Sequence, residues 1–307
     1  MSRITADSTA SGVEPFGTTG IVKIKGTAAH HRLGLLPFGF FMLLFLGVPL
    51  LGITMSALRV ADPTAPGQYT LGLENFTGSF QGAAWAAMEN SLLVSLSAAL
   101  IGGVIGLALA QGILQTRSTK LYAVVAVLTS VLANSGGVPL AFSFIAAVGN
   151  AGIITALFSL NDLGFTLYSN NGLILMYQYF LVPMMVMVVL PTLAGLRREW
   201  KEAAASLGGT GWHFWNKVGL PIAMPAVMSG FVLLFGASFV THAAAAALIG
   251  AGGVPLVTLR IGSGLSGGNL AGQEGIAMAL GVNMIVVAAV VLILYMPLQK
   301  RSLRWFS

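Results

Sequence analysis

The chain has 307 residues, of which 56% are hydrophobic and 8% are charged, with a formal net charge of +6 and a mean hydropathy of +0.87. Soluble domains carry about 25% charged residues, so this chain has too few to cover a water-facing surface. The composition therefore excludes a soluble enzyme, a disordered chain and a nucleic-acid-binding protein. The sequence contains no cysteine, which excludes disulfides, thiolate metal ligands and cysteine nucleophiles.

Six charge-free runs are long enough to cross a bilayer, which takes roughly 18 or more residues. Each run is expected to hold one spanning helix, and the approximate spans are 33–57, 90–112, 121–147, 172–195, 222–247 and 275–298.

The distribution of basic residues predicts the orientation of these spans. With the N-terminus inside, two basic residues, Arg59 and Arg260, fall outside, and the other 13 of the 15 Lys and Arg residues fall inside. Cytoplasmic segments of membrane proteins are enriched in Lys and Arg. A seventh span in either of the two longest runs, 121–161 or 218–259, would spoil this asymmetry. The sequence therefore predicts an all-α polytopic membrane protein with six transmembrane helices and both termini in the cytoplasm.

The segments around the spans define the predicted organisation. Residues 1–32 are rich in Ser, Thr and Gly and are expected to form a disordered cytoplasmic tail. The run 33–58 is interpreted as a retained first transmembrane helix, not a cleaved signal peptide. Residues 59–84 form an outer loop, 85–300 form the core, and 301–307 form a cytoplasmic C-terminus.

Polar residues inside the spans leave two interpretations open. None of the spans has a central charged residue, which argues against a proton- or ion-coupled carrier. The third span contains Gly136, Gly137 and Pro139, which should interrupt its helix. Uncharged polar side chains in the spans either hydrogen-bond between helices or line a solute pathway, and the candidates are Asn134, Ser135, Gln178, Ser238, Thr241, His242 and Asn283.

Several other motifs are interpreted as structural. The stretch 262–267 fits G-x-G-x-x-G but has no preceding strand, following helix or acidic partner, and we expect a flexible outer loop there. Gly102 and Gly106 form a G-x-x-x-G pattern that favours close helix packing. None of the four histidines, His30, His31, His213 and His242, has a ligand at metal-binding spacing, so no metal site is predicted.

The segment 196–221 is the longest predicted cytoplasmic loop between spans, and it holds six of the chain's 24 charged residues. A short helix is expected over 200–207, ended by Gly208 and Gly209. A second helix over about 211–218 follows, before the fifth span starts at 219–221. Its aromatic residues, Trp212, Phe214 and Trp215, would be exposed. Such a pair is either an interfacial amphipathic element or a docking surface for a cytoplasmic partner.

This loop resembles the EAA motif, E-A-A-x3-G-x9-I-x-L-P, of type I permeases of binding-protein-dependent ABC importers. Val218 replaces Ile, and all other positions match. The stretch 90–92 is also similar to the family, and the resemblance covers about 85–300. The matching residues are Glu202, Ala203, Ala204, Gly208, Leu220 and Pro221.

The resemblance implies the fold of a type I ABC importer permease in a bacterial inner membrane. The loop would form coupling helices in a groove of a cytoplasmic ATPase dimer, with Glu202 facing the ATPase, Gly208 permitting the turn, and Trp212 and Trp215 beside them. ATP and Mg would lie on the ATPase, so this chain would be no enzyme and would bind no cofactor. An external solute-binding protein and a second permease chain, more often a different one, would complete the transporter.

The stretch 134–142 is similar to permeases for polyamines, iron, thiamine or aminoethylphosphonate. Two other classes compete with the importer: a secondary transporter or channel without an ATPase, and a membrane-embedded enzyme. The EAA-like loop and the uncharged spans argue against a carrier. His242 has no obvious catalytic partner, which argues against an enzyme.

Overall fold

The computed structural model describes residues 37–61, 68–116, 118–250, 253–266 and 273–303. Within these ranges six helical segments are long and apolar enough to cross a membrane, which confirms the predicted all-α fold. The tail 1–32 and residues 304–307 lie outside the described residues. The six segments are Pro37–Leu58, Gly82–Gln115, Val138–Phe158, Asn170–Ala194, Gly211–Val240 and Glu274–Pro297.

Contacts divide the chain into two compact parts, residues 1–49 and 50–307. The described end of the first part is helical and includes a π-helical turn, η1, at Leu43–Gly47. The helix α2, Val48–Leu58, continues into the second part.

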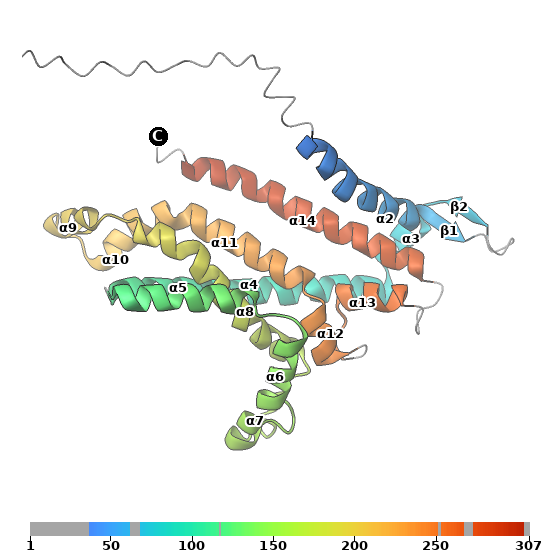
Figure 1. Cartoon of the computed structure of the whole chain (residues 1–307), viewed down its shortest axis with the longest axis horizontal. Coiled ribbons are helices and arrows are strands. Elements are labelled where there is room, and N and C mark those ends of the chain that lie inside the picture. The colour runs from blue at the N-terminus through green and yellow to red at the C-terminus, as the bar shows by residue number, and fades with distance from the viewer. Residues whose placement is uncertain (1–36, 62–67, 117, 251–252, 267–272, 304–307) are drawn as a thin grey trace, which may run out of the picture. The chain divides into compact units, whose positions relative to one another are not determined.

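Three long helices form the centre of the second part (Figure 1). They are α4 (Gly82–Gln115), α8 (Asn170–Ala194) and α11 (Leu220–Val240), and each packs against the other two. The helix α5 (Thr119–Asn134) also packs against α8, and α14 (Glu274–Leu303) packs against α11. Fully buried residues such as Leu181, Met185 and Leu234 fill the space between them.

Glycines allow α4 and α8 to approach closely. A Cβ atom on Gly106 would lie 2.5 Å from the Met185 Cβ and 2.9 Å from the Val182 carbonyl oxygen. A Cβ atom on Gly102 would lie 2.9 Å from the Gln178 Oε1 atom. Both distances are too short for a side chain, so the G-x-x-x-G pattern serves helix packing, as predicted.

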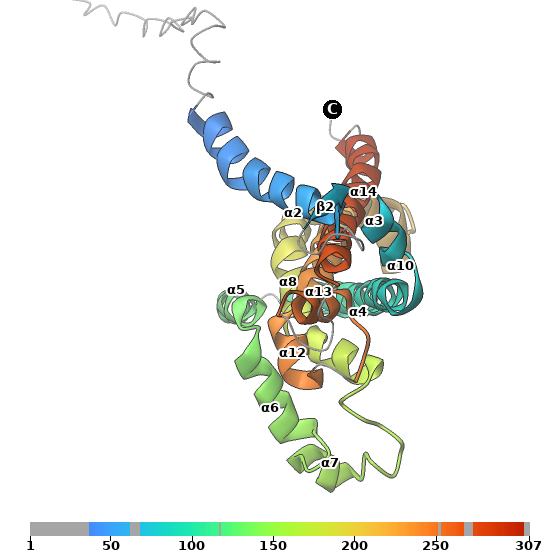
Figure 2. The same ribbon diagram turned by 90° about the vertical axis from the view of Figure 1, so that its right-hand side faces the viewer.

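The third span is broken where its glycines predict a break. The helix α5 ends at Asn134, and α6 (Val138–Val148) begins after Gly137, which has a φ of 88°. The helices α6 and α7 (Ile153–Phe158) leave the central bundle sideways (Figures 1 and 2). The predicted interruption is therefore present, because left-handed backbone at Gly137 redirects the chain. The bounds expected for the span, 121–147, are different: the segment long enough to cross a membrane is Val138–Phe158.

The fifth span also differs from the expectation of 222–247. The helix α11 ends at Val240, and Thr241 and His242 connect it to a separate short helix, α12 (Ala243–Ile249), which packs against α6. The helix α13 (Val257–Leu265) follows and packs against α14 and α4. It contains residues 262–265 of the G-x-G-x-x-G match, so the flexible loop expected there is wrong, and residue 267 lies outside the described residues. Gly262 and Gly264 are part of this helix, and their lack of a side chain lets α13 lie close to His242 and Ala277.

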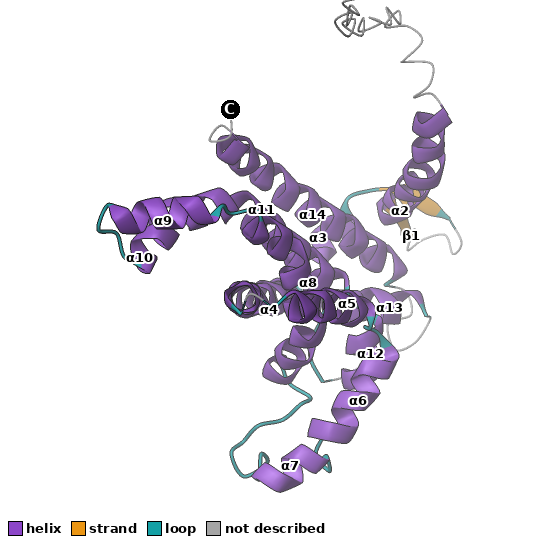
Figure 3. Cartoon of the chain, turned by 60° about the vertical axis from the view of Figure 1, so that its left-hand side comes forward, coloured by secondary structure: helices purple, strands orange, loops and turns teal. Residues whose placement is uncertain are grey.

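The segment after α2 holds a small element that the sequence pattern did not predict. The strands β1 (Arg59–Ala61) and β2 (Tyr69–Leu71) pair antiparallel, with Val60 opposite Thr70 (Figure 3). The helix α3 (Glu74–Ser79) follows and packs against α14. The Asn75 side-chain amide donates to the backbone carbonyls of Ala57 and Arg59, which ties α3 to the end of α2.

We expect Gly106→Ala to destabilise the protein and Gly103→Ala to leave it unchanged. A methyl group at Gly106 collides with α8, whereas at Gly103, one turn away on the same helix, it meets nothing within 4 Å. Overpacking a close contact costs about 1–3 kcal/mol. Thermal unfolding of the detergent-solubilised protein measures the difference, and equal stabilities of the two variants would contradict this packing.

Candidate functional site

The helix α9 (Arg198–Ser206) carries the acidic residue of the EAA-like motif on an exposed surface. Glu202 and Ala203 are exposed, Ala204 is half-buried, and α9 packs against the short helix α10 (Gly211–Phe214). At its start the Arg197 guanidinium lies 6.0 Å from the centre of the Trp200 ring, within the range of a cation–π contact. The helix therefore presents a charged, accessible face.

The predicted helix–turn–helix is confirmed between α9 and α10. Gly208 has a φ of 78°, and its N–H group donates to the Ala205 carbonyl. The Gly209 N–H group donates to the Ala204 carbonyl at 2.9 Å, and the Thr210 hydroxyl accepts from the His213 N–H group at the start of α10. These hydrogen bonds pair backbone groups that would otherwise be left free at the end of α9 and at the beginning of α10. The turn over Gly208–Thr210, called the elbow below, therefore has a defined conformation.

The second helix of the loop does not end before the fifth span, contrary to the prediction. It passes from α10 through a π-helical turn, η2 (Trp215–Gly219), directly into α11. Leu220 is half-buried and Pro221 exposed at the start of α11, directly after the π-helical turn. One helical segment thus runs from Gly211 to Val240.

The aromatic residues of the loop differ in exposure from the prediction. Trp212 is 73% exposed, as expected, but Phe214 is buried and Trp215 is half-buried against the bundle. Phe214 and Trp215 line a pocket together with residues of α4 and α8, whereas Trp212 does not line it.

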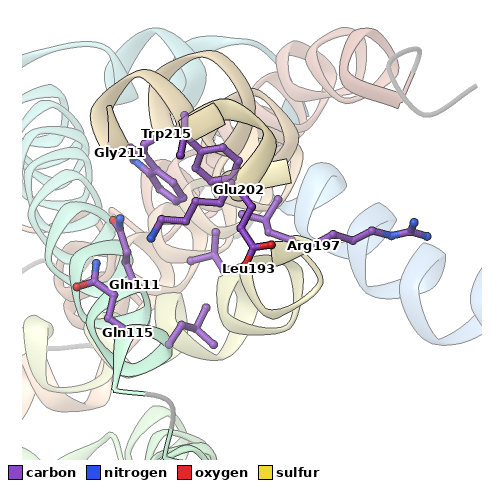
Figure 4. A pocket seen from close by; sticks show the side chains of 12 residues that line it. Gln111, Gln115, Leu193, Arg197, Glu202, Gly211 and Trp215 are labelled. Carbon is purple, nitrogen blue, oxygen red and sulfur yellow. The ribbon is translucent and has the colours of Figure 1, made fainter. Parts of the chain in front are cut away.

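A pocket of about 760 Å³ lies between this loop and the ends of α4 and α8 (Figure 4). The helix α4 contributes the amides of Gln111 and Gln115, and α9 contributes Lys201 and Glu202. Arg197 points away from the other labelled side chains. The remaining lining residues are mainly apolar: Leu114, Leu193, Leu196, Ala205, Gly211, Phe214 and Trp215.

The seven polar residues suggested for a solute pathway lie at different places. Asn134 is exposed and Ser135 half-buried, both at the α5–α6 break, and their side chains donate to carbonyls of α5. His242 is exposed beside Gly262 of α13, with Thr241 next to it. Asn283 donates to the Ser79 hydroxyl and so joins α14 to α3.

Two of these residues lie between central helices. The Gln178 amide donates to the Ala98 carbonyl of α4 and to the Ile174 carbonyl of its own helix. Its Oε1 atom is buried and has no hydrogen-bond partner among the described residues. Ser238 is buried in α11, with its hydroxyl 2.9 Å from the Leu234 carbonyl and 3.3 Å from that of Ser95 in α4. The Gln178–Ala98 bond therefore connects α8 to α4, and the Ser238–Ser95 bond connects α11 to α4.

One side-chain cluster was not identified from the sequence. Asn90 of α4 and Asn170 of α8 exchange amide hydrogen bonds of 3.1 and 2.7 Å, and Asn90 also donates to the Pro255 carbonyl. The Ser91 hydroxyl accepts from the Val257 N–H group. The cluster fastens the start of α13 to the central helices. The similarity of 90–92 to the family was the one signal that pointed to it.

Among the described residues, no group of three or more His, Asp or Glu side chains could hold a metal ion.

Curated permease proteins resemble part of the sequence, whereas no protein-family model matches it. A probable sulfate transport system permease protein, cysT, of Chlorella vulgaris is 34% identical over 88 residues, 28% of this chain and 32% of that protein. The thiamine transport system permease protein ThiP of Salmonella typhimurium is 28% identical over 127 residues, 41% of this chain and 24% of that protein. The chain thus spans a third or less of the length of these relatives.

The fold resembles chains of solved ABC transporters. A crystal structure of a bacterial ABC transporter involved in the import of alginate matches with a TM-score of 0.66 and 19% identity, over 89% of this chain and 96% of that chain. A structure of an alginate ABC transporter with a pentasaccharide-bound periplasmic protein matches with a TM-score of 0.65 and 20% identity, over 89% and 94%. Part of the sequence is therefore similar to permease proteins of transport systems, and the chain shares the fold of chains in solved ABC transporters.

Proposed function

We propose that the chain is the membrane-spanning permease subunit of an ATP-driven importer and forms half of a route for a small polar solute. The observation that carries this proposal is the exposed helix α9, joined by a bonded glycine elbow to a helix that runs without interruption from Gly211 to Val240. A force applied to α9 by a docked partner would reach the membrane interior along that helix.

The partners follow from the geometry of docking. An ATPase dimer would present two docking grooves, and this chain offers one α9, so a second permease chain is required. We favour a different second chain over a second copy. ATP and Mg would be bound by the ATPase, and α9 would face the cytoplasm with both chain termini. A binding protein would deliver the solute from outside, as the alginate transporter solved with its periplasmic protein suggests by analogy.

The route for the solute is proposed to pass the α5–α6 break. The helix α5 has 16 residues and so extends about 24 Å, less than the roughly 30 Å of a bilayer's hydrocarbon core. With the charged Lys120 at the membrane surface, α5 would end within the hydrocarbon core. Gly136 between the two helices is exposed in the described structure, and a Cβ atom built on it meets nothing within 4 Å. Such backbone is tolerated only against protein or water, which favours a watered route beside the second permease chain.

The solute is proposed only as small and polar. The relatives are named for sulfate and for thiamine, and the solved neighbours for alginate. Of the expected set of polyamines, iron, thiamine and aminoethylphosphonate, thiamine appears in the name of a relative. The solute-binding protein would select the solute.

We expect a cysteine at Asn134 to react with a water-soluble thiol reagent and a cysteine at Ser238 to remain protected. Asn134 is exposed at the break, whereas Ser238 is buried between α11 and α4. The chain has no native cysteine, so the background is clean. Labelling of membrane vesicles with and without nucleotide measures this. If Asn134→Cys stays unlabelled in every nucleotide state, the break is not on a watered route.

We expect Gly208→Val to weaken association with the ATPase about tenfold and Gly208→Asn to retain it. A Cβ atom at Gly208 meets nothing within 4 Å, so its positive φ is the constraint. Left-handed backbone costs most residues roughly 1–2 kcal/mol, and asparagine tolerates it better. Co-purification with the ATPase measures the effect. Equal retention by both variants would mean that the elbow angle does not matter for docking.

We expect Glu202→Ala to lose ATPase association and uptake, and Glu199→Ala to keep both. Both residues are exposed carboxylates of α9, but only Glu202 lies in the EAA-like motif and lines the pocket. Removing one partner of an ion pair that becomes buried costs about 3–5 kcal/mol. Uptake in whole cells and ATPase co-purification are the readouts. Normal values for Glu202→Ala would make the loop an interfacial helix pair and remove the main support for the importer.

A further inference from the structure

The turn that joins α10 to α11 is wider than an α-helical turn. The Leu220 N–H group donates to the Trp215 carbonyl, five residues back, as in a π-helix. Pro221 follows directly. A proline in a helix lacks an N–H group, and its ring crowds the carbonyl four residues earlier, here that of Lys217. The wider turn removes this crowding, and π-helical turns within α-helices often lie at functional sites.

The indole of Trp215 occupies the space that a side chain at position 219 would need. Gly219 is buried, and a Cβ atom built on it would lie 2.6 Å from Trp215 Cε3 and 3.0 Å from Cζ3. Cβ atoms in a helix tilt toward its N-terminus, so a side chain at 219 would point back onto residue 215. Glycine at this position therefore lets the indole lie flat on the π-helical turn.

Trp215, the first residue of η2, contacts both the central helices and the pocket beside α9. It packs against the buried core of the bundle and also lines the pocket that Lys201 and Glu202 of α9 line (Figure 4). The helix is otherwise α-helical from Gly211 to Val240, so η2 is the one departure from α geometry along it in the described structure. Along the chain, α10 is joined to α11 through this turn.

We propose that the Trp215–Gly219 contact is the joint through which movement of α9 and α10 is transmitted to α11, and that both are positioning residues for coupling ATP hydrolysis to transport. The indole holds the π-helical turn in one geometry, so that a displacement of α10 moves α11 instead of being absorbed in the turn. This inference rests on the proposed importer function. It assigns Trp215 to the interior of the joint, not to the surface that touches the ATPase.

The first test compares two glycine-to-alanine variants of the same helix. In vesicles reconstituted with the ATPase, Gly219→Ala should lower the solute taken up per ATP hydrolysed about fivefold, the order expected for a residue that modulates coupling. Gly236→Ala is the matched control, because a Cβ atom there meets nothing within 4 Å. It should leave the ratio unchanged. Full uptake per ATP in Gly219→Ala would overturn the proposal.

The second test asks whether the loss of uptake per ATP in Gly219→Ala is caused by displacement of the Trp215 indole. Trp215→Ala creates no clash and should fold, bind the ATPase as the unsubstituted protein does, and lower uptake per ATP to a similar extent. Adding Gly219→Ala to Trp215→Ala should cause no further loss, because the ring that it displaces is gone.

An additional fivefold loss in the double variant, or full uptake per ATP in Trp215→Ala alone, would overturn the proposal. These outcomes are distinguishable from failure of the importer function itself. In that case the unsubstituted chain would not bind the ATPase at all.

Discussion

The hydrocarbon interior of a bilayer offers the backbone no hydrogen-bond partners, so every N–H and C=O group at that depth must find one within protein or water. The long helices of this chain meet that requirement by themselves. Between the helices, side chains pair with some of the backbone groups: Asn90 donates to the Pro255 carbonyl, and Ser91 accepts from the Val257 N–H group. At the α5–α6 break, Asn134 and Ser135 bond carbonyls of α5, but Gly136 between the two helices is exposed, and this directs attention to a partner chain and water.

Features that depend on local chemistry could be predicted from the sequence. Charge-free runs located the spanning segments, because length and apolarity decide what crosses a membrane. Paired glycines predicted the break at 136–137 and the elbow at 208–209, since both need backbone that other residues resist. The Gly102–Gly106 spacing predicted close packing. The roles of Glu202 and of the polar residues in the spans stay predictions.

Features that depend on contacts between distant segments could not be predicted from the sequence. Pro221 suggested a helix start, but the preceding residues pack on the bundle and keep the helix continuous. Gly262 and Gly264 suggested a loop, yet their missing side chains let α13 lie against His242 and Ala277. The Asn90–Asn170 pair joins residues 80 positions apart, and no local pattern specifies it. Glycine in a membrane helix is ambiguous in sequence, because it permits a bend and close packing equally.

Met185 touches glycines on two neighbouring helices. Its Cβ and Cγ lie against Gly106 of α4, and its sulfur lies 2.5 Å from where a Cβ atom on Gly230 of α11 would be. One flexible thioether thus sets the spacing of three helices at once. Changes at Gly106 and Gly230 would compete for the same volume, so their energetic effects would not add. The two positions form an epistatic pair, and a substitution tolerated at one depends on the residue at the other.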